Sequence, residues 1–215
     1  MDVLVAGGHG QIGLRLSKLL AARGDSARGL IRNPDHAADL TAIGAEPIVC
    51  DLESQDPGPY VRGADAIVFA AGAGPGSGPD RKRTVDYGAA VKLVEAAMEQ
   101  GVDRYVMVSS MGAGDPDAAP EPMRPYQRAK HEADEALKAS GLAYTIVRPG
   151  GLTDDPGTGR IVAAPSLGRR GSVTRDDVAA TLLAVLDTPV TAGLTFEVLE
   201  GDQPIAAAVA ALAAT

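Results

Sequence analysis

The sequence has little cysteine, few aromatic residues and a deficit of positive charge. Cys50 is the only cysteine, which excludes an intramolecular disulfide, and its place in the apolar run 48–50 predicts a buried side chain. Tryptophan is absent and aromatic residues make up 3% of the chain, so valine, leucine, isoleucine and alanine must form the core. Such a core is typical of parallel strands covered by helices on both faces.

The charge balance and the lack of long apolar runs argue against several kinds of partner. The chain carries 20 basic and 28 acidic side chains, a net charge of −8, whereas nucleic acids and anionic membranes attract clustered Lys and Arg. No apolar run reaches the roughly 18 residues of a membrane span. The N-terminus lacks the basic segment of a signal peptide, and no His or Cys cluster indicates a metal site. We therefore expect a cytoplasmic protein that acts on a small molecule and binds neither nucleic acid nor membrane.

Strand and helix patterns alternate along the 215 residues. Short apolar runs predict strands at 3–6, 27–31, 47–50, 66–71, 105–108, 144–147 and 194–199. Helical periodicity lies between them, as at 84–100 and 125–140, and this alternation is typical of an α/β fold with a Rossmann-type doubly wound parallel sheet. The segments 72–79 and 112–122 read as loops at the carboxyl edge of the sheet, where ligands bind. No linker divides the chain, so we expect one domain over 1–215, with 150–215 as a short C-terminal extension on the substrate side.

Three glycines, Gly7, Gly10 and Gly13, lie between the first strand and the first helix. This spacing allows a tight turn, a close approach of the backbone to a pyrophosphate, and close packing of helix on strand. The helix N-terminus at Gln11 and Ile12 offers free N–H groups and the positive end of the helix dipole to phosphates. The sequence therefore predicts a dinucleotide-binding site at these five residues, in preference to a purely structural turn.

The end of the second strand indicates which dinucleotide binds. NAD sites place a carboxylate there, whereas NADP sites tend to use an arginine, and this strand ends with Arg32. A guanidinium binds phosphate in a bidentate manner, so NADP(H) is favoured over NAD(H). The alternative is a solvated arginine at a strand end.

Residues after the third and fourth strands complete the predicted cofactor site. The Asp51 carboxylate could accept a hydrogen bond from the adenine amino group or could begin a turn, and the sequence leaves both interpretations open. Small residues after the fourth strand would let the backbone pass close under the cofactor. The predicted contacts here are Asp51, Leu52, Ala70, Ala71 and Gly72.

A serine pair, a tyrosine and a lysine follow in that order. Ser109 and Ser110 end the fifth strand, and Tyr126 and Lys130 lie four residues apart on the next helix, so they share a helix face. A lysine ammonium lowers the pKa of a neighbouring tyrosine, which can then exchange a proton with a carbonyl or alcohol. The same lysine could bind a nicotinamide ribose, and a serine hydroxyl could bind the reacting oxygen. The alternative is a surface pair without function.

Other charged residues have simpler interpretations. The basic run 81–83 is either solvated or a clamp for an anionic substrate. Asp86, at the start of a predicted helix, is interpreted as a helix-terminus or packing residue. Arg148 is interpreted as the structural partner of a carboxylate elsewhere in the chain.

Taken together, these segments resemble the short-chain dehydrogenase/reductase superfamily. The similarity is to its atypical branch of NAD(P)-binding and NAD-dependent epimerase/dehydratase-like proteins, near the NmrA-like and biliverdin/flavin-reductase-like groups. It covers nearly the whole chain through the segments 7–13, 32–34, 51–52, 85–86, 104–110, 126–130 and 144–153.

The resemblance implies a Rossmann fold with a catalytic Ser-Tyr-Lys set. Ser110 matches the catalytic serine better than Ser109, and Tyr126 and Lys130 match directly. The resemblance also implies that cofactor contacts come from Ser109, Lys130, Pro149, Gly150, Gly151 and Leu152. Extended members carry a larger C-terminal substrate domain, so the pocket here must be small, open or completed by another subunit.

We therefore expect an NADP(H)-dependent oxidoreductase that transfers hydride to or from a small carbonyl, alcohol or redox-active ring. One alternative is a regulator of NmrA type that senses NAD(P) without turnover. Another is a sugar epimerase or dehydratase-like enzyme. The substrate, the direction of reaction and the oligomeric state stay open at this stage.

Overall fold

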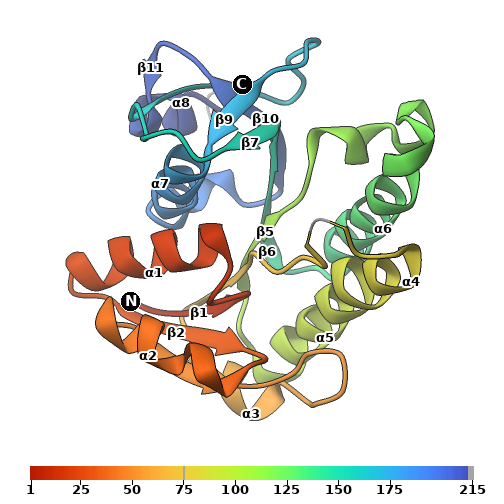
Figure 1. Ribbon diagram of the computed structural model, residues 1–215. Helices are drawn as coiled ribbons and strands as arrows, with labels where there is room; N and C mark the ends of the chain where they lie inside the picture. Colours follow the sequence, from red (N-terminus) through yellow and green to blue (C-terminus); the bar gives the residue numbers. More distant parts are fainter. Residues whose placement is uncertain (75, 213–215) are drawn as a thin grey trace.

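The computed structural model describes residues 1–74 and 76–212, and a nine-stranded sheet forms its centre (Figure 1). The strand order is β11-β8-β10-β6-β5-β4-β1-β2-β3. Strands β1 to β6 and β10 run parallel, and β8 is antiparallel to β10 and β11. The strands are β1 (Asp2–Ala6), β2 (Ser26–Ile31), β3 (Glu46–Val49), β4 (Ala66–Phe69), β5 (Arg104–Val108), β6 (Ala143–Pro149), β8 (Arg160–Ala164), β10 (Leu194–Glu200) and β11 (Gln203–Pro204).

The order of the strands confirms the predicted doubly wound sheet. From β1 the chain builds outward to β2 and β3 on one side and to β4, β5 and β6 on the other. The reversal between β1 and β4 is the topological switch point, where open α/β sheets bind ligands beyond the carboxyl ends of the strands.

Helices cover both faces of the sheet. Figure 1 shows α1 (Gln11–Ala22) and α7 (Arg175–Leu186) on one side, and α5 (Ala90–Gln100) and α6 (Arg124–Ala139) on the other. The core consists of two mainly aliphatic clusters, one under each helical layer, as the composition predicts, and three buried aromatic residues, Phe69, Tyr105 and Phe196, add to them. Cys50 lies in the second cluster at 2% exposure, and burial raises the pKa of its thiol. The shorter helices are α2 (Ala37–Ala42), α3 (Gly58–Val61), α4 (Pro79–Arg81) and α8 (Ile205–Leu212).

Some elements differ from the sequence prediction. The predicted helix over 84–100 begins earlier, with α4 followed by a π-helical segment over 82–89, and only then continues as α5. The segment 112–122 contains short 3₁₀ turns instead of an irregular loop. The strands β8, β7 (Gly151–Thr153) and β9 (Ser172–Thr174) were not predicted, because such short strands depend on a partner that is distant in sequence. Among the described helices, none is long and apolar enough to cross a membrane.

Candidate cofactor and active site

The turn between β1 and α1 requires glycine because backbone segments approach closely there. Gly7 has φ +80°, and a Cβ on it would lie 2.7 Å from the backbone of Ala71. A Cβ on Gly13 would overlap the carbonyl oxygen of Gly7, and the Gly10 N–H donates to that same oxygen at 2.8 Å. Helix α1 begins without a capping side chain and without an acidic residue in its first turn. Its first N–H groups are therefore suited to a phosphate, so the turn fits a dinucleotide.

The side chains of the next two predicted residues do not face this turn. Gln11 accepts a hydrogen bond from Arg15 at 2.7 Å, and Ile12 is 8% exposed in the core. Only the backbone of these two residues is placed to bind a phosphate.

A cavity of about 320 Å³, here called the β1–β4 cavity, lies at the topological switch point. Its size and position suit the adenosine half of a dinucleotide. It brings together most of the cofactor residues predicted from the first half of the chain, namely Gly7, Gly10, Arg32, Asp51, Leu52, Ala70, Ala71 and Gly72.

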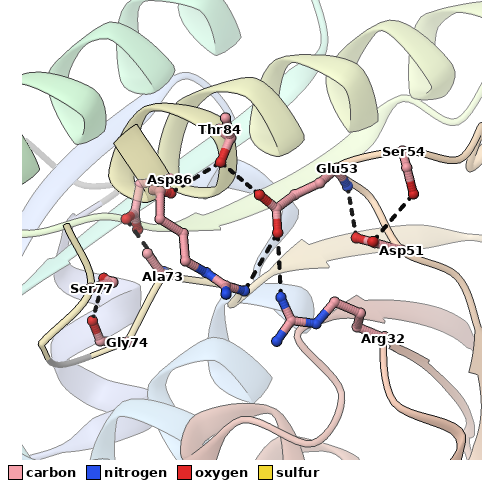
Figure 2. Close-up of polar contacts among 10 residues, drawn as sticks. Arg32, Asp51, Glu53, Ser54, Ala73, Gly74, Ser77, Thr84 and Asp86 are labelled. Atoms are coloured by element: carbon pink, nitrogen blue, oxygen red, sulfur yellow. Dashed lines mark hydrogen bonds and ion pairs between the residues drawn. The ribbon is translucent and has the colours of Figure 1, made fainter. Parts of the chain in front are cut away.

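Glu53, which the sequence analysis missed, lies beside Arg32 in this cavity (Figure 2). Its Oε2 lies 3.4 Å from a guanidinium nitrogen of Arg32 and 3.4 Å from one of Arg81, and its Oε1 accepts from the Thr84 hydroxyl at 2.6 Å. The Arg32 side chain is 55% exposed, and both arginine contacts are long, so these ion pairs are weak. The basic run therefore contributes one arginine, Arg81, to the cofactor cavity.

The turn after β3 explains the position of Glu53. The Asp51 carboxylate accepts from the Glu53 N–H at 3.0 Å and from the Ser54 hydroxyl at 3.2 Å (Figure 2). Both carboxylate oxygens of Asp51 are thus engaged in a turn. This geometry favours the turn over the adenine contact, the two interpretations that the sequence left open.

A second cavity, of about 810 Å³ and here called the β5–β6 cavity, lies beyond the ends of β5 and β6. Ser110 and Tyr126 share its wall, and Gln127 donates to the Ser110 hydroxyl at 3.0 Å. Ser109 lines neither cavity within the described chain, because it is 4% exposed and donates to Asp134 at 2.8 Å. The segment predicted to lie beside the nicotinamide also lines the cavity, with Pro149, Gly150, Gly151 and Leu152.

Lys130 lies behind this cavity and not in its wall. It is 3% exposed, its Nζ donates to the Val108 carbonyl at 3.1 Å, and the same nitrogen lies 3.5 Å from Asp86 Oδ1. Asp86 is 1% exposed and comes from the π-helical segment, a conformation often found at functional sites. Lys130 is absent from the described residues that line the two cavities. The structure therefore brings it near Tyr126 but not into the cofactor cavity.

The pKa of Tyr126 departs from the direction expected from the lysine alone. Burial raises this pKa, while the charge of Lys130 and the hydrogen bond to Ser110 lower it and the carboxylates of Asp86 and Asp134 raise it. The net shift is upward because burial has the largest effect, and the carboxylate of Asp86 offsets part of the lowering by Lys130. Tyr126 is therefore protonated at neutral pH.

A buried ion pair joins α6 to β6 beneath the site. Arg148 Nη2 lies 2.9 Å from Asp134 Oδ2, and the Asp134 side chain has no exposed surface. Burial raises the pKa of Asp134, and Arg148 opposes that shift. The predicted structural pairing of Arg148 with a carboxylate is confirmed.

Comparisons with known proteins agree with this arrangement. The family described as NAD(P)H-binding matches residues 7–189. A Bacillus subtilis protein named uncharacterized sugar epimerase YhfK is 44% identical over 97% of this chain and 98% of its own length. A solved Bacillus halodurans structure, provisionally named NAD-dependent epimerase/dehydratase, has a TM-score of 0.95 and 41% identity over 99% of this chain and all of its own. The anaerobillin reductase ChuY from Escherichia coli O157:H7 has a TM-score of 0.80 and 26% identity over 94% of this chain and 98% of its own.

Proposed function

The chain belongs to the NAD(P)H-binding family, and on that basis we propose that it is an NADP(H)-dependent oxidoreductase that reduces a small carbonyl compound or redox-active ring. The supporting observation is that Ser110 and Tyr126 share the wall of one cavity with the segment 149–152. A bound NADPH supplies the hydride for such a reduction. The name of the related anaerobillin reductase also supports a reductase.

The side chains of the β5–β6 cavity supply the proton. Tyr126 Oη donates a proton to the substrate oxygen as the carbon accepts hydride, and the Ser110 hydroxyl donates a hydrogen bond to the same oxygen. Gln127, bonded to Ser110 at 3.0 Å, orients that hydroxyl. Tyr126 is protonated at neutral pH, as a tyrosine with an unshifted pKa would also be, so it can act as the proton donor. Lys130 acts through its charge on Tyr126.

The β1–β4 cavity accounts for the proposed NADP(H) preference. Arg32 and Arg81 are two cations that reach one carboxylate, Glu53, and a 2′-phosphate would offer them a stronger partner. Glu53 can keep its bond to Thr84 when the arginines turn to the phosphate. Its carboxylate nevertheless lies close to the proposed phosphate and opposes binding.

A sugar epimerase is the second candidate, because two relatives carry epimerase names. An epimerase returns hydride to its substrate, so it consumes no cofactor and retains NAD(P) through purification. Absorbance of the supernatant after denaturation detects a retained dinucleotide. A regulator that senses NAD(P) would bind the free cofactor but would not oxidise NADPH. A Tyr126 variant would then have the same lack of turnover as the wild type.

Two measurements test the proposal. Calorimetric titration with NADPH and NADH should give tighter NADPH binding in the wild type, and Arg32→Ala should remove the difference. NADPH oxidation is then screened against aldehydes, quinones and flavins. Tyr126→Phe should lower kcat by about 10²–10⁴-fold and leave NADPH affinity unchanged, whereas the control Tyr60→Phe, on α3 and outside both cavities, should leave both unchanged. Equal rates in Tyr126→Phe and wild type would refute the assigned proton donor.

A further inference from the structure

The loop between β8 and β9 adds two adjacent arginines to the β5–β6 cavity. Arg169 and Arg170 line the same cavity as Ser110 and Tyr126. Both arginines are exposed, and neither forms an ion pair or a side-chain hydrogen bond with residues 1–74 or 76–212. In a chain of net charge −8, two adjacent unpaired cations in a cavity are unexpected.

The other charged groups of the cavity are already engaged. Arg175 pairs with Asp154 at 3.0 Å. Glu197 accepts from the Leu167 N–H at 2.7 Å, and Asp115 accepts from the N–H of Ala118 at 3.3 Å. Each of these two carboxylates accepts a hydrogen bond from a backbone N–H, and neither pairs with Arg169 or Arg170. The two guanidinium groups are therefore available to bind an anionic ligand.

The loop that carries the arginines is held at both ends. The Glu197 contact fixes Leu167 on one side, and on the other the Gly171 carbonyl accepts from the Gly151 N–H at 2.9 Å. A Cβ on Gly150 would overlap Gly171 or Leu199, so the loop packs directly on the end of β6. The backbone of the loop that carries the arginines is thus held beside the segment 149–152.

Apolar side chains lie on the same cavity. Met123 is 44% exposed and Leu152 is 37% exposed, and both line it. Exposed large apolar residues that gather in a cavity mark a binding surface. The cavity therefore combines apolar side chains, a proton donor and an unpaired cationic group.

We propose that Arg169 and Arg170 form an anion-binding subsite, and that the substrate is an apolar, reducible compound that carries a carboxylate or phosphate group. This inference rests on the proposed function for the reacting end of the substrate. The arginine pair binds the acidic group, since guanidinium donors match the geometry of both anions. The carbonyl or ring then lies at Ser110 and Tyr126.

Binding of three matched naphthalene probes tests the subsite without turnover. The probes are 2-naphthoate, 2-naphthyl phosphate and the neutral 2-naphthamide, titrated calorimetrically into the protein saturated with NADPH. We expect an acidic probe to bind the wild type about tenfold or more tightly than the amide, with an affinity that falls as salt rises. The tighter of the two acidic probes identifies the anion that the subsite prefers.

Two double variants, each of which lacks two positive charges, show whether the binding depends on the arginine pair itself. Arg169→Gln/Arg170→Gln should bring the acidic probes to the affinity of the amide. Lys18→Gln/Arg62→Gln removes the same number of charges outside the cavity and should change nothing. Equal binding of acid and amide by the wild type, or a preference that survives in the Arg169/Arg170 variant, would overturn the proposal.

The two proposals fail separately. If no acceptor oxidises NADPH but the arginine-dependent binding of an acidic probe is found, the reductase proposal is wrong and the anion subsite stands. If benzaldehyde and 4-carboxybenzaldehyde are reduced with equal kcat/KM, the subsite is wrong and the reductase stands. Where the acid is preferred, Arg169→Gln/Arg170→Gln should raise its KM and leave kcat unchanged.

Discussion

Substitution of Lys130 by methionine should destabilise the fold because it leaves a carboxylate buried without its partner. The Lys130 and Asp86 side chains are 4% and 1% exposed, and the charged atoms lie 3.5 Å apart. Removal of one member of such a buried pair costs about 3–5 kcal/mol of unfolding free energy. Asp86→Leu should cost a similar amount, because it leaves the ammonium of Lys130 buried without its carboxylate, with the Val108 carbonyl and the Phe69 ring as neighbours.

The double variant Lys130→Met/Asp86→Leu should recover most of this loss. Replacement of both members by apolar residues of similar size removes the desolvation penalty together with the attraction, and in other proteins it is neutral or stabilising. The double variant therefore separates structure from chemistry. It should fold like the wild type and reduce substrate more slowly, because Lys130 lowers the pKa of Tyr126 by more than Asp86 raises it, and loss of the pair therefore raises that pKa further.

Urea unfolding followed by circular dichroism measures the free energies of the wild type and the three variants. The sum of the two single losses should exceed the loss in the double variant by several kcal/mol. A single-variant loss below about 1 kcal/mol, the value of an exposed pair, would refute the reasoning that this pair is desolvated. An unchanged rate in the folded double variant would show that the Lys130–Asp86 pair has no net effect on the reaction.

Three further predictions follow from individual residues. Tyr105→Phe should stabilise the protein by about 1–3 kcal/mol in urea unfolding, because the buried hydroxyl has no hydrogen-bond partner in the described part of the chain. Burial also raises the pKa of Tyr105. Wild-type stability is thus complete below about pH 10 and falls above it by about 1.4 kcal/mol per pH unit as only the unfolded chain releases the proton, a loss that Tyr105→Phe should lack. Gly13→Ala should weaken NADPH binding in calorimetry by about tenfold or more, because its Cβ would overlap the Gly7 carbonyl; unchanged affinity would contradict the tight-turn assignment. Glu53→Gln should tighten the binding of NADPH but not of NADH, and equal tightening of both would argue against a 2′-phosphate at this position.

Local sequence patterns predicted much of the fold and the cofactor turn. The apolar runs and helical periodicity are read over neighbouring residues, and they identified β1 to β6, β10, α1 and α6. The glycine spacing of the first turn follows from contacts within a few residues of chain, so the sequence alone indicated its geometry. The short strands β7, β8 and β9 escaped prediction because their pairing energy comes from distant partners.

The choice between the two serines depended on the tertiary structure. Consecutive residues of a strand point to opposite sides, so adjacent serines at a strand end cannot both face the same cavity. The packing of α6 decides the matter, since Asp134 takes Ser109 and the cavity retains Ser110.

The electrostatics of the site were likewise decided only by the fold. The spacing of Tyr126 and Lys130 correctly indicated that they are neighbours on a helix. The effect of the lysine also depends on Asp86, which lies 44 positions earlier (130 − 86), on the π-helical segment that packs against α6. Glu53 meets Arg32 and Arg81 for the same reason. Helix, strand and turn are set by interactions between near neighbours in the chain, whereas burial, charge pairing and the shape of a cavity arise where distant segments meet.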